Sequence, residues 1–244
     1  LLNNPRTGEL RALVDGNLIT NMRTGAQSAV FAKYLASKTD ILTIIGGGTQ
    51  GIFTALCMLE LFDLKEIRVS DISKDACEHF TKIVSQKTSI PVKAYDSNEE
   101  AVKDADIIVT ATTANTPLVY KKWVKPGVFI SSIGSYQELE EELILKADKR
   151  YVDHMGQNLH RGEFYNCFQK GILKESDITG EIGDVICGKA LRRERPDEII
   201  VASPIGMGCL DIATGAIIYN RILESDNEVI MKFSIIRTSS SVEV

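Results

Sequence analysis

A glycine-rich segment that joins an apolar run to a predicted helix constrains the fold of this chain most. Residues 41–45 read Ile-Leu-Thr-Ile-Ile, which predicts a short buried strand. The next residues read Gly46-Gly47-Gly48-Thr49-Gln50-Gly51, and a helix is expected over 50–61. Glycines spaced as G-x-G-x-x-G between a strand and a helix are typical of a βαβ unit that binds a dinucleotide.

Each glycine of the pattern has its own physical reason. Gly46 permits the tight turn, and Gly48 lets the backbone approach a pyrophosphate at the helix N-terminus, where Thr49 and Gln50 begin the helix and offer free N–H groups. Gly51 lets the helix pack closely on the strand. We therefore expect all five residues to bind the cofactor. A glycine-rich turn without a ligand is the alternative, and the strand–turn–helix context argues against it.

An acidic residue at the end of the second predicted strand indicates which dinucleotide binds. Asp71 lies twenty positions after Gly51, where a carboxylate accepts hydrogen bonds from both hydroxyls of the adenosine ribose. The same carboxylate repels a 2′-phosphate, and the next residue is Ile72 rather than an arginine. Asp71 and Ile72 therefore predict NAD as the cofactor rather than NADP. The alternative is that Asp71 only caps the helix that follows Ser73.

The middle of the chain alternates between strand and helix patterns. Strands are expected over 41–45, 67–69, 92–95, 107–109, 128–130, 151–152 and 199–201, and helices over 50–61, 74–84, 99–104, 138–145 and 210–223. This alternation predicts an α/β fold with a parallel sheet covered by helices on both faces. The loop 110–115 follows a buried strand and so lies at the carboxyl edge of the sheet, where ligands bind.

Two residues of that loop complete the expected cofactor site. The small side chain of Ala111 leaves room for the nicotinamide ribose, and the hydroxyl of Thr112 can donate a hydrogen bond to it. The alternative is a loop that is held only by its own hydroxyl groups.

The two ends of the chain follow a different pattern. Short strands are expected over 1–2 and 10–14, with a second turn at 15–17 before residues 18–20, and the apolar residues between 26 and 34 predict a helix. Near the C-terminus, residues 229–236 alternate as in a final strand, and the polar residues 238–241 predict a frayed tail. The charged segment 192–197 is expected to be a solvated turn.

Composition excludes several classes of function. The net charge is −5, which argues against nucleic acid as a partner because phosphate binding requires a basic face. No apolar run approaches the roughly 18 residues of a membrane span, and the first residues do not resemble a signal peptide. We therefore expect a cytoplasmic protein that has no membrane partner.

The cysteines and histidines do not predict a metal site. The five cysteines are widely spaced without a CxxC pair, and the three histidines have no ligand spacing. We expect no metal, and at least four of the cysteines to be buried thiols in a reducing compartment.

Several segments together resemble the ornithine cyclodeaminase/μ-crystallin family. The segments that carry the resemblance are Asp15-Gly16, Ile19-Thr20, Arg23-Thr24-Gly25-Ala26, the turn from Gly46 to Gln50, residues 105–112, Pro117, Trp123, Lys125-Pro126-Gly127, Ile133-Gly134, Glu141 or Glu142 with Leu143, Val152-Asp153, residues 181–185, and Gly206 with Asp211. They follow the family order over nearly the whole chain. The resemblance is therefore specific for the family, and much less specific for the reaction.

The resemblance implies a Rossmann domain plus a smaller α+β domain for dimerisation and substrate binding, which here lacks its N-terminal part. We place the Rossmann domain at 37–202 and the discontinuous second domain at 1–36 and 203–244, and we expect a homodimer. The resemblance also implies that Arg23 binds the substrate carboxylate, for which a guanidinium offers a two-pronged fork, and that Ile133 contacts the cofactor. A surface arginine is the alternative for Arg23, which is expected to begin a helix.

Two departures from the family pattern affect the expected chemistry. Family members usually carry several tens of residues before the Asp15-Gly16 segment, and a catalytic lysine and a substrate-binding arginine normally lie in that part. The chain is therefore expected to be a fragment or a shortened relative. In addition, ornithine cyclodeaminases carry an aspartate base where this chain has Tyr136, and a phenol with a reference pKa near 10 cannot replace it at neutral pH.

The leading hypothesis is an NAD-dependent oxidoreductase that acts on the carbon–nitrogen bond of a small α-amino acid or its imine or ketimine. An ornithine-type cyclodeaminase that uses NAD catalytically is one alternative, and a non-catalytic crystallin-like binding protein is another. Asp211 is the candidate catalytic residue, because it follows a glycine-containing loop and could hold or deprotonate the substrate amine. The alternative is that Asp211 only caps the helix that begins near it.

Overall fold

The computed structural model describes residues 1–134 and 137–224. The described residues divide into two compact units, Asp15–Asp211 and Leu1–Val14 with 212–224. Within the larger unit, helix α1 (Gly16–Leu35) packs directly on helix α2 (Thr49–Leu59). A Cβ at Gly25 would lie 2.8 Å from the carbonyl oxygen of Phe53. The assignment of residues 1–36 to a substrate and dimerisation domain stays a prediction.

The larger unit contains a parallel sheet with the strand order β5-β4-β3-β6-β7-β10-β8-β9. The strands are β3 (Ile41–Ile45), β4 (Glu66–Ser70), β5 (Val92–Ala94), β6 (Ile107–Thr110), β7 (Phe129–Ser132), β8 (Lys149–Val152), β9 (Gly180–Glu181) and β10 (Ile200–Ser203). The order reverses between β3 and β6, and the crevice at the carboxyl ends of such strands is where doubly wound sheets bind ligands.

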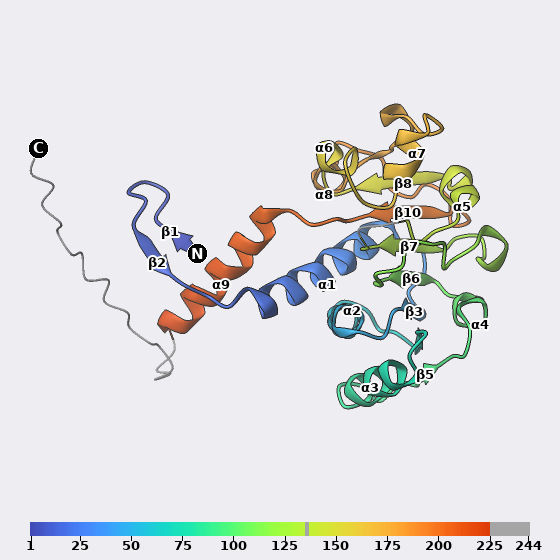
Figure 1. Ribbon diagram of the computed structural model, residues 1–244, viewed down its shortest axis with the longest axis horizontal. Helices are drawn as coiled ribbons and strands as arrows, with labels where there is room; N and C mark the ends of the chain where they lie inside the picture. Colours follow the sequence, from blue (N-terminus) through green and yellow to red (C-terminus); the bar gives the residue numbers. More distant parts are fainter. Residues whose placement is uncertain (135–136, 225–244) are drawn as a thin grey trace, which may run out of the picture. The chain divides into compact units, whose positions relative to one another are not determined.

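Helices cover both faces of this sheet, with α1, α2 and α3 on one side and α4 and α5 on the other (Figure 1). The helices after α2 in this unit are α3 (Lys74–Ser85), α4 (Asn98–Val102), α5 (Glu141–Lys146), α6 (Met155–Asn158), α7 (Tyr165–Gln169) and α8 (Ile182–Ile186), with 3₁₀ turns at Lys121–Trp123 and Glu175–Asp177. The predicted α/β Rossmann fold is confirmed. Helix α5 begins three residues later than expected, because the Glu138 and Leu139 N–H groups bond to Glu163 instead.

The central strands are buried on both faces because their side chains alternate between two apolar cores. On β3, Ile44 packs into the core under α1, α2 and α3, whereas Ile45 packs into the opposite core. On β6, Val109 and Ile108 divide in the same way. Successive strand residues point to opposite faces, so a continuous apolar run is what a doubly covered strand requires. Each such side chain contributes about 1.5–3 kcal/mol when fully buried.

Helix α1 begins earlier than the sequence pattern suggested. Asp15 is its N-cap, and its Oδ1 accepts the N–H of Asn17 at 3.0 Å. The expected turn at 15–17 is therefore the cap and first turn of the helix, because an Asp that could start a turn serves equally well as a helix cap. As a consequence Arg23 lies in the middle of α1, and the expectation that it begins a helix is wrong.

One expectation about exposure is wrong. Cys57, Cys77 and Cys167 are buried, but Cys187 and Cys209 are exposed, since Cys187 lies at the C-cap of α8 and Cys209 in the first turn of α9. The segment 192–197 is exposed at every residue except Arg193, as the charged pattern predicted. Arg193 turns inward and its Nε donates to the carbonyl oxygen of Leu35 at 2.8 Å.

The smaller unit contains a two-stranded antiparallel sheet, β1 (Leu2–Asn3) with β2 (Leu10–Ala12). Helix α9 (Gly208–Glu224) enters this unit at Ile212. The predicted final strand at 229–236 and the tail at 238–241 lie outside the described residues. No helix within residues 1–134 and 137–224 is long and apolar enough to cross a membrane.

Candidate active site

The glycine-rich turn between β3 and α2 requires the absence of side chains at two positions. Gly46 has a φ of +108°, and a Cβ there would lie 2.6 Å from the carbonyl oxygen of Ala111. A Cβ at Gly51 would lie 2.1 Å from the carbonyl oxygen of Gly46. A side chain at Gly46 would push against the loop after β6, and one at Gly51 would force α2 away from the turn, so the turn can close only with glycine at both.

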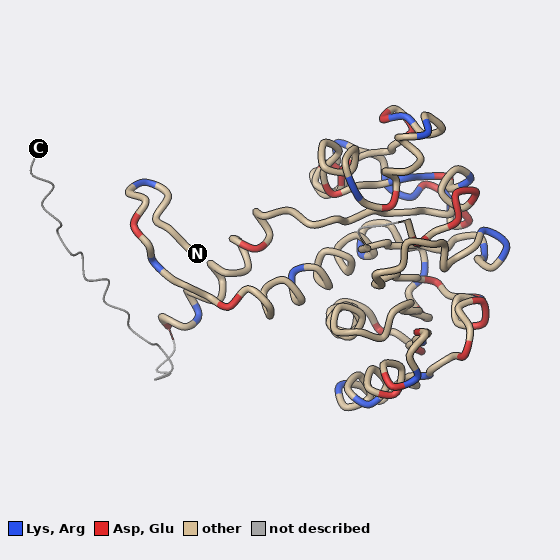
Figure 2. The backbone as a smooth tube through the Cα atoms, viewed as in Figure 1, with Lys and Arg blue, Asp and Glu red and all other residues tan. Residues whose placement is uncertain are grey.

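The N-terminus of α2 can receive an anion. Gly48 is the N-cap, and no side chain of the described residues caps the helix. The helix carries no charged residue along its length (Figure 2), so its partial positive charge faces the turn without an opposing carboxylate on the helix itself. Thr49 is exposed. The side chain of Gln50 turns away, because its Nε2 donates to the carbonyl oxygen of Asn21 in α1 at 3.1 Å.

Asp71 connects the glycine-rich turn to the start of α3. Its Oδ2 accepts the N–H of Gly47 at 2.8 Å, and its Oδ1 accepts the N–H of Ser73 at 2.8 Å. Ser73, not Asp71, caps α3 with its side chain. Asp71 is only half-buried and Ile72 is fully exposed. The carboxylate therefore holds the turn in place and still faces solvent.

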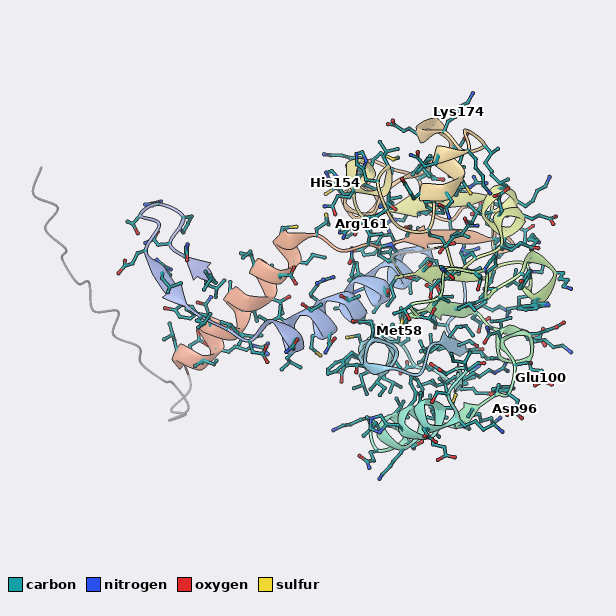
Figure 3. The ribbon with its side chains drawn as sticks, in the orientation of Figure 1. Met58, Asp96, Glu100, His154, Arg161 and Lys174 are labelled. Atoms are coloured by element: carbon teal, nitrogen blue, oxygen red, sulfur yellow. The ribbon has the colours of Figure 1, made fainter. Side chains whose placement is uncertain are left out.

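These residues line one cavity of about 370 Å³ at the carboxyl edge of the sheet. Its lining consists of Ile45, Gly46, Gly48, Ser70, Asp71, Ile72, Asn98, Ala111, Thr112, Thr113, Ala114 and Leu118. A second hollow shares Asp71 and Ile72 and extends to Lys74 and Asp96; Asp96 is labelled in Figure 3. The lining residues come from four stretches of the chain, 45–48, 70–72, 98 and 111–118. The cavity lies where the strand order of the sheet reverses.

Thr112 does not offer its hydroxyl to the cavity as expected. The hydroxyl donates to Oε1 of Glu138, which also accepts the Thr112 N–H at 2.9 Å. The Thr112 methyl group faces the turn instead, 2.9 Å from where a Cβ of Gly46 would lie. Glu138 is completely buried, so it takes this donor away from any ligand.

Arg23 and Asp211 form an ion pair. Arg23 Nε lies 2.9 Å from Asp211 Oδ1, and the two side chains are 16% and 40% exposed. The guanidinium packs over Gly206, where a Cβ would lie 2.6 Å from Nη1. Helix α9 begins at Gly208, so Asp211 lies inside its first turn and is not its cap. The structure thus joins the two predicted substrate residues, but neither lines the cavity described above.

A family model described as the ornithine cyclodeaminase/mu-crystallin family matches residues 1–226. The chain belongs to this family. An alanine dehydrogenase of Archaeoglobus fulgidus is 32% identical over 238 residues, which cover 96% of this chain and 73% of the relative.

Two solved structures resemble the chain over most of its length. A Δ(1)-pyrroline-2-carboxylate reductase of Thermococcus litoralis, in complex with NADH and L-proline, has a TM-score of 0.87 at 32% identity and covers 91% of this chain and 70% of that one. An archaeal alanine dehydrogenase dimer with bound NAD has a TM-score of 0.88 at 32% identity and covers 95% and 73%. The predicted family is confirmed, and these relatives bear out the predicted class of NAD-dependent oxidoreductase.

Some predicted cofactor residues of this family member lie behind the cavity rather than in its wall. Gly51 lies under the turn, against Gly46. Ile133 is half-buried and packs against the core under α1, α2 and α3. Thr49, Gln50, Gly51 and Ile133 are absent from the cavity lining among the described residues. Their roles as cofactor residues stay predictions.

A buried carboxylate, which sequence reasoning named only as part of the family resemblance and gave no role, lies beside the Arg23–Asp211 pair. Asp153 is 3% exposed, and its Oδ2 accepts Gln27 Nε2 at 2.9 Å and the Gly206 N–H at 2.6 Å. Its Oδ1 accepts Asn158 Nδ2 at 3.1 Å and the N–H of His154 at 2.9 Å; His154 is labelled in Figure 3. Gln27 lies one turn after Arg23 on α1, so Asp153 ties that helix to the loop before α9.

Sequence reasoning also missed a pair of buried glutamates, Glu138 and Glu163. Burial raises the pKa of Glu138 above its usual range, although Thr112 and Thr110 donate to it. Burial raises the pKa of Glu163 to about 8, against the opposing effect of the N–H of Glu138 and the hydroxyl of Ser132. The only sequence signal was an acidic residue just after a loop, which is too common to indicate a site.

Proposed function

We propose that this chain is an NAD-dependent oxidoreductase that interconverts a small α-amino acid and its imine or ketimine. The observation that carries the proposal is one cavity lined by the glycine-rich turn at the N-terminus of α2 and by the exposed edge of Asp71. NAD, when bound, supplies the hydride acceptor, and the protein supplies position and charge.

The residues of the cavity fit NAD. The absence of side chains at Gly46 and Gly48 lets a pyrophosphate reach the uncapped N–H groups of α2. Asp71 keeps unused lone pairs beside its bonds to Gly47 and Ser73, so it can accept the ribose hydroxyls. Its charge and the apolar side chain of Ile72 disfavour a 2′-phosphate. These features favour NAD over NADP.

Arg23 and Asp211 suit an amino-acid substrate. The Nε of Arg23 is committed to Asp211, whereas its two Nη groups pack over Gly206, where the missing side chain makes room for the guanidinium. We propose that the Nη edge binds the substrate carboxylate and that Asp211, which is partly exposed, holds or deprotonates the substrate amine. The pair carries no net charge, so it suits a substrate that brings both an anion and a cation.

The relatives support this substrate class. Their names specify alanine and Δ(1)-pyrroline-2-carboxylate, one an α-amino acid and the other a cyclic imine that bears a carboxylate. Both present a carboxylate next to a carbon–nitrogen bond, which is the arrangement that Arg23 and Asp211 would hold. We therefore propose small α-amino acids and cyclic imino acids as the first compounds to test.

The test incubates the protein with NAD and a panel of amino acids, and with NADH and cyclic imines, while absorbance at the NADH band and product mass are followed. Equal amounts of NADH and imine product support a dehydrogenase. A cyclised product without accumulation of NADH points to a cyclodeaminase and overturns the proposal. Binding of NADH without turnover of any compound overturns it in favour of a non-catalytic binding protein.

We also propose a homodimer in the cytoplasm. Leu18 and Met22, one turn apart on α1, are 54% and 41% exposed, and Ile212 and Ile217 on α9 are exposed as well; neighbouring exposed apolar side chains on a helix can form the kind of patch that marks an interface. The archaeal relative is a dimer. All five cysteines are free thiols, which suits a reducing compartment. Sedimentation as a monomer at micromolar concentration would contradict the dimer, and recovery in the membrane fraction would contradict the location.

A further inference from the structure

Two buried glutamates lie directly behind the wall of the dinucleotide cavity. Glu138 and Glu163 are both completely buried, and neither belongs to the cavity lining. Among the described residues, no lysine or arginine forms a salt bridge with either one. Burying a carboxylate without a cation is costly, so these side chains are expected to contribute something other than stability.

Glu138 holds Thr112 at two points. Its Oε1 accepts the Thr112 N–H at 2.9 Å and also the Thr112 hydroxyl. Its Oε2 accepts the hydroxyl of Thr110 at 2.7 Å and that of Ser132 at 3.3 Å. The backbone and the side chain of Thr112 are therefore both fixed by one carboxylate oxygen, while the other oxygen anchors the carboxylate to the ends of β6 and β7.

The position of Thr112 determines the shape of the cavity. Its methyl group faces Gly46, and its hydroxyl oxygen accepts the N–H of Ala114 at 3.0 Å. Ala111, Thr112 and Ala114 all line the cavity. A movement of Thr112 would therefore shift the wall that faces the glycine-rich turn.

Glu163 holds Glu138 in turn. Its Oε2 accepts the Glu138 N–H at 3.0 Å and the Ser132 hydroxyl at 2.6 Å, and its Oε1 accepts the Leu139 N–H at 2.9 Å. The N–H of Glu163 donates to the hydroxyl of Ser203 at 3.2 Å. The carboxyl ends of β6, β7 and β10 are thus tied together through two glutamates.

We propose that Glu138 is a positioning residue for the dinucleotide, which fixes the wall 111–114 from behind through Thr112, and that Glu163 holds Glu138 in place. The proposal rests on the proposed binding of NAD in this cavity. It assigns no contact between either glutamate and the ligand. Its consequence is that loss of the Glu138 carboxylate weakens dinucleotide binding more than it weakens the fold.

The experiment compares Glu138→Leu with Glu138→Gln by titrating each with NADH and following fluorescence. A glutamine keeps one oxygen for the two Thr112 donors, while its NH₂ donates to the hydroxyls of Thr110 and Ser132, which can reverse. Leucine removes every bond. We expect NADH Kd to rise about tenfold in Glu138→Leu, the scale of a lost hydrogen bond to a charged group, and to stay within about twofold in Glu138→Gln.

A matched control separates binding from stability. Glu198 is also buried, at 2% exposure, but it precedes β10 at the opposite edge of the sheet, where it accepts the Glu194 N–H at 2.9 Å and lies 3.4 Å from Lys149 Nζ. Glu198→Leu should lower the thermal midpoint and leave NADH Kd unchanged. An equal rise in Kd for Glu198→Leu and Glu138→Leu would show that loss of stability alone weakens binding, and would overturn the proposal.

Two further outcomes test the positioning role of Glu138 and the proposed binding of NAD separately. Wild-type affinity in a folded Glu138→Leu variant overturns the positioning role, whereas failure of the unmodified protein to bind NADH overturns the proposed function itself. If Glu138→Leu does not fold, Thr112→Val replaces it, because valine keeps the shape and removes only the hydroxyl. A rise of about threefold in NADH Kd for Thr112→Val supports the role, and an unchanged Kd overturns it.

Discussion

Asp71 and Asp211 each combine a structural partner with an exposed edge. Asp71 uses one oxygen for Gly47 and the other for Ser73, and it also borders the cavity. Asp211 pairs with Arg23 while it stays partly exposed. Each carboxylate has a structural partner as well as a free edge, so replacing it can change both stability and ligand binding. The effect of a substitution is therefore measured as a ratio of affinities, or together with the thermal midpoint, rather than as activity alone.

The double change Asp71→Ser with Ile72→Arg should move cofactor preference toward NADP. The serine removes the charge that repels a 2′-phosphate, and the arginine offers a partner for it. Loss of the bond to the Gly47 N–H will weaken both cofactors, so the measurement is the ratio of Kd for NADPH and NADH. Equal affinity of the unmodified protein for both cofactors would contradict this assignment of Asp71.

Asp211→Asn tests the catalytic role of Asp211. Asparagine keeps the size and the hydrogen-bonding oxygen that Arg23 needs, but it cannot take up a proton. We expect kcat to fall by about 10²-fold, the scale of a lost general base, with NADH Kd and the thermal midpoint unchanged. A folded variant with wild-type turnover would leave Asp211 only its ion pair with Arg23.

Arg23→Lys provides the complementary change in the same pair. Lysine keeps the charge but loses the fork that binds a carboxylate at two points. The KM of the amino acid should rise by about tenfold, while NADH Kd stays the same because Arg23 does not line the dinucleotide cavity. An unchanged KM would remove Arg23 from the substrate site.

At the scale of elements, the close approach of α2 to β3 forms the cofactor site. The carbonyl oxygen of Gly46 lies where a side chain at Gly51 would have to be, so the turn and the first turn of the helix touch through their backbones. This contact brings the uncapped end of α2 to the carboxyl edge of the sheet. A helix held farther away would leave its N–H groups out of reach of a bound pyrophosphate.

Gly51→Ala should therefore destabilise the protein and weaken cofactor binding together. The added methyl group would displace α2, at a cost of about 1–3 kcal/mol in unfolding free energy, and NADH Kd should rise. Gly183→Ala in α8 is the control, because a Cβ there meets no atom within 4 Å. Chemical denaturation and NADH titration of both variants check this, and normal NADH affinity in Gly51→Ala would count against the close-packed turn.

At the scale of the whole molecule, two buried carboxyl groups connect folding to pH. Burial raises the pKa of Glu163 to about 8 and also raises the pKa of Glu138. Both groups regain an ordinary pKa on unfolding. Between the unfolded and folded pKa values the folded state therefore holds more protons than the unfolded state, and this contribution to stability is lost as pH rises.

The free energy of unfolding should accordingly fall as pH rises from about 5 to 8, by at most about 1.4 kcal/mol per pH unit for one proton. Denaturant titrations across this range measure the slope. Glu163→Ala should flatten the slope if it folds, since the group with the raised pKa is gone. Stability that increases between pH 5 and pH 8 in the unmodified protein would show that Glu163 ionises at its ordinary pKa.

The sequence alone predicted features whose causes lie within a few residues along the chain. The strand over 41–45, the glycine spacing and the acid at Asp71 are local patterns, because a tight turn, a helix start and a strand end each depend on near neighbours. Their positions in the structure agree with those patterns. The start of α1 at Gly16 was missed for the same local reason, since Asp15 suits a turn and a cap equally well.

Only the tertiary structure decided which distant side chains meet. Arg23 and Asp211 are 188 positions apart, and Asp153 joins Gln27 on α1 to Gly206 across 126 and 53 positions. Glu138 and Glu163 lie on loops that approach one another because β6, β7 and β10 are neighbours in the sheet. Contacts between buried polar side chains depend on the order of the strands in the sheet rather than on the spacing of apolar residues along the chain, so no local pattern could indicate them. In addition, a glutamate after a loop is ordinarily exposed.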